Sequence, residues 1–239
     1  QLTVVNNMPN KDMGKLRIID IIPTPDDRTF GRGSKRGSEW TLNVANLETE
    51  ENAFSVILKK ADGTESDITD NVTVYYTTSD NVATYGTPFI RNELENEAWD
   101  GIWLSAYPSG ERATAVAFDL GNTILDQNDR IVIQFLTNVQ EFDGETEKEK
   151  AAFTYAYNNF SFRYEGIDEN GQSTFNDIIT SNTVNAILAP NTVQVGGKIW
   201  IDANGNGIQD ESEQYLTEKV KELWDEGRFT IRLHKSGDV

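Results

Sequence analysis

Short runs of β-favouring residues fill positions 1–190, and this pattern constrains the fold more than any other feature. Apolar and polar residues alternate with a period of two in "TVYYTT" and "TAVAFDL". Such a period places one face of a strand against a core and the other toward water. The runs are "LTVVNN", "KLRIIDIIP", "EWTLNVANL", "AFSVILKKADG", "VTVYYTTSD", "GIWLSAY", "ATAVAFDLG", "RIVIQFLTNV", "AAFTYAYNNFSFRYEG" and "TVNAILAP". About ten strands with hairpin-length connections predict an all-β first domain, an antiparallel immunoglobulin-like β-sandwich over residues 1–190.

A domain boundary is expected near "LAPNTVQVGG". Pro190 favours an extended linker, and Gly196 and Gly197 give the backbone conformational freedom before a new strand, "KIWID". A second domain therefore covers residues 191–239. It is short for an independent core, so we expect it to be incomplete or to lean on the first domain.

The second domain is expected to contain one short helix between two strands. The segment from Ser212 to Glu226 has apolar residues at helical spacing, namely Leu216, Val220, Leu223 and Trp224. Gly227 is suited to end the helix. The segment "RFTIRLHK" then alternates like a strand and carries the only histidine, His234. One histidine and no cysteine leave little for a His-dependent triad or a zinc site.

The stretch "IDANGNGIQDESE" has the spacing of a calcium loop, D-x-[DN]-x-[DN]-G-x₅-E. Calcium binds six to eight oxygens, and a glycine at position six permits the sharp turn that aims the next carbonyl inward. The predicted ligands are Asp202, Asn204, Asn206, the carbonyl of Ile208, Asp210 and Glu213, with Gly207 at the turn. Calcium is the expected cofactor. The loop follows the strand-like "VGGKIWI" and not a helix. This favours a structural calcium site that holds two segments together over a calcium sensor in which binding opens a groove between two helices.

The segment "VGGKIWIDANGNGIQDESE" resembles the opening of the calcium-binding B-type repeat of serine–aspartate repeat adhesins of Gram-positive bacteria. The resemblance covers Gly196, Trp200 and the loop. It implies a transthyretin-like or immunoglobulin-like module that acts as a calcium-rigidified spacer in a cell-wall-anchored stalk. Residues 215–226 depart from the family pattern, because a helix stands where its loop runs directly into the second strand. The first domain is similar, more loosely, to repeat domains of large Gram-positive surface proteins. That likeness rests on "VTVYYTTSD", a tryptophan some twenty residues later (Trp99 or Trp103) and "ATAVAFDLGNTILDQNDRIVIQFLTN".

The amino-acid composition limits which kinds of partner this chain can bind. Asp and Glu number 39 against 21 Lys and Arg, a formal charge of −18, and such a surface repels nucleic acid and anionic membranes. No apolar run is long enough to cross a membrane, and no signal peptide is visible before "QLTVV". We expect a segment of an extracellular, cell-surface protein whose partners are calcium and its neighbouring domains.

The sequence raises three other chemical possibilities. Lys15 could form an internal isopeptide bond with Asn158 or Asn159, although exposed lysine and ordinary strand asparagines are the favoured interpretation. Trp99, Trp103 and Tyr107 could form a sugar-stacking platform, although alternation places all three on one face and favours core packing. No pair of carboxylates stands out for glycoside hydrolysis, so no enzyme is expected.

The predicted function is therefore structural: calcium at one EF-hand-like loop rigidifies the stalk of a bacterial adhesin. The first alternative is that residues 1–190 bind a host extracellular-matrix protein or a glycan. A weaker alternative is a dockerin-like module of an extracellular enzyme complex. Dockerins carry two such loops that lead into helices, whereas this chain has one loop that follows a strand.

Overall fold

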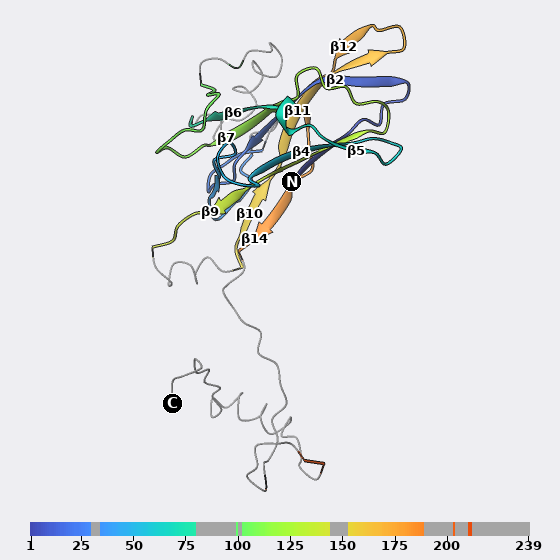
Figure 1. Cartoon of the computed structure of the whole chain (residues 1–239). Helices are drawn as coiled ribbons and strands as arrows, with labels where there is room; N and C mark the ends of the chain where they lie inside the picture. Colours follow the sequence, from blue (N-terminus) through green and yellow to red (C-terminus); the bar gives the residue numbers. More distant parts are fainter. Residues whose placement is uncertain are drawn as a thin grey trace. The chain divides into compact units, whose positions relative to one another are not determined.

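The chain divides into two compact units, Gln1–Pro190 and Asn191–Val239. The structure is a computed structural model, and it describes residues 1–29, 34–79, 99, 102–143, 153–188, 203, 210 and 211. The first unit is all-β, and its sheets are antiparallel (Figure 1). Within the described residues its only helical element is a 3-10 turn, η1 (Thr69–Asn71). The predicted helix between Ser212 and Glu226 lies outside the described residues.

Two larger sheets build the first unit. The four-stranded sheet has the order β1 (Leu2–Val5), β8 (Arg130–Phe135), β4 (Phe54–Lys59), β5 (Glu65–Asp67). The six-stranded sheet has the order β12 (Ser173–Phe175), β11 (Phe160–Asp168), β2 (Lys11–Ile21), β7 (Ala115–Asp119), β6 (Thr73–Thr77), with β13 (Ile179–Thr180) also paired to β11. Two short ribbons pair β3 (Leu42–Val44) with β9 (Thr137–Val139) and β10 (Tyr155–Asn158) with β14 (Val184–Ile187).

The two larger sheets pack on each other through a shared core, which we call the inter-sheet core. Phe54 and Phe135 of the four-stranded sheet each lie with their ring centroid 5.5 Å from that of Phe118 on β7. The core also includes Leu2, Val4, Val56, Ile131 and Ile133 from one sheet and Ile18, Tyr76, Val116 and Phe160 from the other. This arrangement is that of a β-sandwich, in which inward-facing side chains of two sheets interdigitate.

The six-stranded sheet is covered on its other face as well. Alternation along β2 and β7 points Ile19, Ile21, Ala115 and Ala117 away from the inter-sheet core. Trp103 packs on these residues, and together they form a second cluster, which we call the outer cluster. Because both faces are covered, the second half of β2 is buried at nearly every position.

A β-bulge interrupts β2 at Lys15. The register with β11 shifts between Arg163 and Glu165, and Lys15 has a φ of 45°. The extra residue changes the phase of the strand, so Met13 and Leu16 both reach the inter-sheet core although they are three positions apart. After the bulge, Ile18, Asp20 and Ile22 share the inward face.

Candidate functional site

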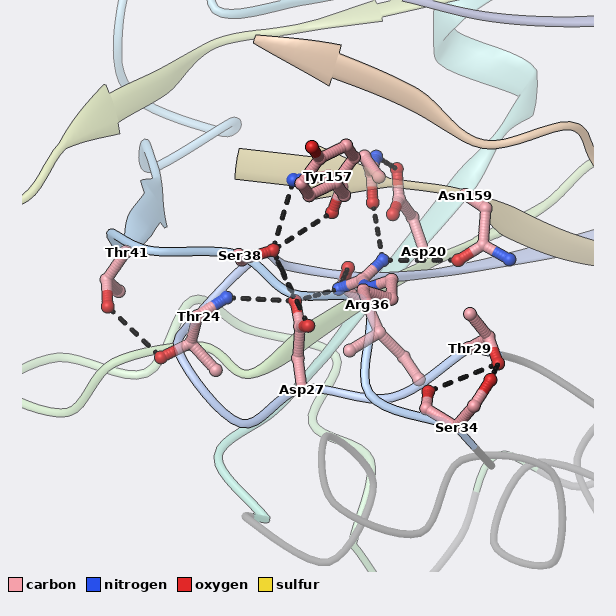
Figure 2. A network of polar contacts seen from close by, with 12 residues as sticks. Asp20, Thr24, Asp27, Thr29, Ser34, Arg36, Ser38, Thr41, Tyr157 and Asn159 are labelled. Carbon is pink, nitrogen blue, oxygen red and sulfur yellow. Dashed lines mark hydrogen bonds and ion pairs between the residues drawn. The ribbon is translucent and has the colours of Figure 1, made fainter. Parts of the chain in front are cut away.

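A buried ion pair anchors the connection that follows β2. Arg36 Nη2 donates to Asp27 Oδ2 at 2.6 Å, and both side chains are fully buried. The Thr24 amide and the Ser38 hydroxyl also donate to Asp27 Oδ2, at 3.0 and 3.2 Å. Figure 2 shows Arg36 at the centre of this network, with Asp27 on one side and Asn159 on the other. Asp27 is therefore a charge whose desolvation is offset by one cation and two further donors.

Arg36 joins segments that are far apart in the sequence. Its Nη2 also donates to the carbonyl of Ile21, at 2.8 Å. Its Nη1 donates to Asn158 Oδ1 at 2.9 Å and to Asn159 Oδ1 at 3.3 Å. One guanidinium thus connects the end of β2, the following connection and the junction of β10 with β11. This fork geometry suits arginine, whose five donors have fixed directions.

Asp20 is the second buried acid of the network. It has no exposed surface, and it accepts a hydrogen bond from Asn158 Nδ2 at its Oδ2, at 3.0 Å. Its other oxygen, Oδ1, has no hydrogen-bond partner among the described residues. Burial raises the pKa of Asp20 to about 6 and outweighs the Asn158 hydrogen bond and the charge of Arg36, which lower it.

A cavity of about 510 Å³ lies beside Asp20. Its lining residues come from β1, β2, β3, β8, β9, β10, β11, β13 and β14 and from the residues that follow β2 and β13. Asp20 is the only ionisable side chain among its described lining residues, and most of the others are apolar or carry hydroxyl or amide groups. A cavity of this size with few polar groups has the character of a small-ligand site.

The asparagines considered for an isopeptide bond lie far from Lys15. Lys15 Nζ lies 3.5 Å from Glu165 Oε2 and 5.5 Å from the centroid of the Phe175 ring. Asn158 instead contacts Arg36 and Asp20. Asn158 and Glu165 are seven positions apart along nearly extended chain, which corresponds to about 20 Å. A bond between Lys15 and either asparagine is therefore incompatible with this fold.

The aromatic residues considered as a sugar platform pack against the core, but they do not share a face. Trp103 is 5 % exposed in the outer cluster, and Trp99 packs edge-on against it with ring centroids 5.4 Å apart. Tyr107 contacts Tyr76 in the inter-sheet core and donates to the carbonyl of Val44. The prediction of one common face was wrong because the chain forms only an isolated bridge at Leu104 and then bends.

The predicted calcium loop lies almost entirely outside the described residues. Asp210 is described, and it is partly buried. The other predicted ligands, Asp202, Asn204, Asn206, Ile208 and Glu213, are not among the described residues. Within the part of the chain that the structure describes, no three His, Cys, Asp or Glu side chains gather closely enough to hold a metal ion. Calcium binding by this loop therefore remains a prediction.

Sequence reasoning missed the polar network. One signal was available for Asp20: it is a single acid inside an apolar run, "RIIDIIP". An acid in such a run is costly to bury unless it has a partner or a function. Asp27 and Arg36 gave no comparable signal, because they belong to a polar connection rich in Gly, Ser and charged residues.

In comparisons with known proteins, no family model, curated protein or solved structure matches this chain. In the described part, no helix has the length and apolar character that crossing a membrane requires.

Proposed function

We propose that this chain is a structural segment of an extracellular Gram-positive surface protein, with calcium bound by Asp202–Glu213. Residues 1–190 are an immunoglobulin-like sandwich, and residues 191–239 begin a B-type module. The observation that carries the proposal is the complete D-x-N-x-N-G-x₅-E spacing directly after a strand-like segment. The all-β first unit and the division of the chain at Pro190 support it.

Calcium acts mechanically in this proposal. Asp202, Asp210 and Glu213 repel one another when the loop is empty, and the ion removes that repulsion. At a dissociation constant of about 10⁻⁵ M and about 1 mM extracellular calcium, binding stabilises the folded loop by about 2.7 kcal/mol. This is comparable to a disulfide, in a chain that has no cysteine. The ordered loop resists proteolysis and reduces bending at the connection before it.

Calorimetric titration of the whole chain with calcium tests the proposal. Glu213→Gln removes the negative charge of the side chain and replaces one of the two oxygens needed for bidentate closure, so it is expected to weaken binding about tenfold or more. Gln209→Ala changes a neighbour that is not a ligand and is expected to leave the affinity unchanged. Chelation should also lower the melting temperature and expose the stretch from Gly196 to Glu213 to protease. Absence of binding heat, or equal effects of the two substitutions, would contradict the proposal.

A second candidate function is ligand binding by residues 1–190. The cavity beside Asp20 favours it, because a buried acid with an unpartnered oxygen lines that cavity. A panel of matrix proteins and polysaccharides, tested against the whole chain, addresses macromolecular ligands. Loss of any such binding when the cavity is blocked by Thr180→Trp would assign it to this site.

A further inference from the structure

The cavity beside Asp20 carries an inference that is independent of the calcium loop. We propose that it binds an aliphatic primary ammonium group, whether on a small alkylamine or on a lysine side chain. The inference rests on the charge balance of the buried network, on the unpartnered oxygen of Asp20 and on the apolar walls around it.

The buried network has one acid more than it has bases. Asp27 and Arg36 form a close pair, so their charges offset each other. The carboxylate of Asp20 then remains as one negative charge without a buried partner of its own. Arg36 and, most weakly, the α-amino group of Gln1 also favour its ionised form. A cation that enters the cavity would compensate this charge, as buried charges require.

Asp20 Oδ1 supplies the acceptor. Oδ2 of the same carboxylate accepts a hydrogen bond from Asn158, whereas Oδ1 is buried without a hydrogen-bond partner in the described structure. An unsatisfied buried acceptor costs free energy that a donor from a ligand would recover. An ammonium group brings both the donor and the positive charge, so it fits better than a neutral hydroxyl.

The walls select the rest of the ligand. Leu2, Val4, Phe135, Phe160 and Phe162 provide apolar and aromatic surface around the cavity. Each methylene of a straight hydrocarbon chain gains free energy when it leaves water for apolar walls, and aromatic faces attract cations. These walls therefore favour an ammonium group on an alkyl stem over a compact inorganic cation.

The cavity reaches the surface. Two of its lining residues, Ile179 and Val184, are 39 % and 57 % exposed, although Asp20 itself is fully buried. A ligand would therefore enter between these residues with its ammonium group leading, and its far end would stay near solvent. This orientation is compatible with a free amine and with a lysine side chain in a peptide.

Titration of the whole chain with hexylammonium, followed by calorimetry and by NMR shifts of β2 amides, tests the proposal. Saturable binding is expected, with shifts centred on Asp20. Hexanol has the same stem without the charge and is expected to bind at least about tenfold more weakly. This comparison uses the native chain, so it does not depend on any variant folding.

Asp20→Asn keeps the size of the side chain and an acceptor for Asn158 but removes the charge. It is expected to weaken hexylammonium binding about tenfold or more and to leave hexanol binding nearly unchanged. Asp177→Asn removes one exposed charge outside the cavity lining and serves as the matched control.

A lysine-containing peptide with blocked ends distinguishes the two sources of the ammonium group. Binding equal to that of hexylammonium would assign the site to lysine side chains, and binding of the free amine alone would assign it to small amines. The proposal is overturned if hexylammonium shows no saturable binding, if hexanol binds equally well, or if Asp20→Asn has no more effect than Asp177→Asn.

Discussion

Asp27 and Asp20 are both almost completely buried, at 1 % and 0 % exposure, but their surroundings differ. Asp27 accepts hydrogen bonds from Arg36, the Thr24 amide and Ser38. Asp20 accepts one hydrogen bond, from Asn158, and its second oxygen has no hydrogen-bond partner in the described structure. The first acid holds a connection in place. The second is buried with a single hydrogen bond and borders a cavity. This contrast is the reason for assigning a structural role to Asp27 and for proposing a ligand at Asp20.

The strongest test of this comparison removes the charge of Asp27. Asp27→Asn keeps the shape of the side chain but removes the counter-charge to which the buried Arg36 guanidinium is directly hydrogen-bonded. We expect a loss of about 3–5 kcal/mol in the free energy of unfolding. Urea unfolding of the whole chain, followed by circular dichroism of the β-structure, measures the loss.

Arg36→Met supplies the control for this prediction. A double-mutant cycle with Asp27→Asn should show that the double variant loses clearly less than the sum of the two single variants. Strictly additive losses would mean that the two side chains do not act as a pair, and the contrast with Asp20 would then lose its basis.

Asp20 is expected to respond to pH in the opposite sense from an acid stabilised by its partners. Its pKa is raised from 3.8 to about 6 in the folded chain, so the folded state holds this proton more tightly than the unfolded state. The stability that the proton provides is complete below pH 3.8 and is lost as pH rises through 6. Arg36 is the buried cation that acts on this carboxyl, and Asp27 lies beyond it.

Asp20→Asn removes this titration. Relative to the native chain, the variant should gain about 2 kcal/mol in the free energy of unfolding between pH 4 and pH 7. The difference between the two chains is the relevant quantity, because acids with lowered pKa values, such as Asp62 and Asp67, titrate equally in both. A difference that stays constant with pH would show that Asp20 is not strained in the folded state.

These acids also show how far the sequence predicts the fold. Runs such as "RIVIQFLTNV" and "VTVYYTTSD" were correctly predicted as β-structure from their period of two, which matches burial mainly on one face in β8. The prediction that the second face meets water was wrong for "TAVAFDL", because β7 is buried on both faces. The single run "AAFTYAYNNFSFRYEG" instead divides into β10 and β11 at Asn159. The bulge at Lys15 was not predicted, because it is defined by the pairing register with β11, a strand far away in the sequence.

The site was less predictable than the fold. The Arg36 network joins residues more than 120 positions apart through side-chain geometry, which the pattern of one sequence does not encode. The calcium loop is the reverse case, since its ligands are consecutive and the spacing alone predicts them. Local sites are visible in a sequence, whereas sites assembled by tertiary contacts require a structure.

The smallest expected effect concerns an ion pair on the surface. Lys59 on β4 faces Glu65 on β5, and their side chains are 27 % and 55 % exposed. Water screens such a pair and ordering two long side chains costs entropy, so Lys59→Met, which keeps the hydrocarbon stem, should cost about 0.5 kcal/mol or less. The loss should shrink further in high salt, because exposed charges are screened. Urea unfolding at low and high salt measures both values. A loss comparable to that of Asp27→Asn would mean that burial does not decide the strength of ion pairs in this module. A small and salt-sensitive loss would instead show that this exposed pair contributes far less than the buried pair of Asp27 and Arg36. The contrast between Asp27 and Asp20 arises in that buried network.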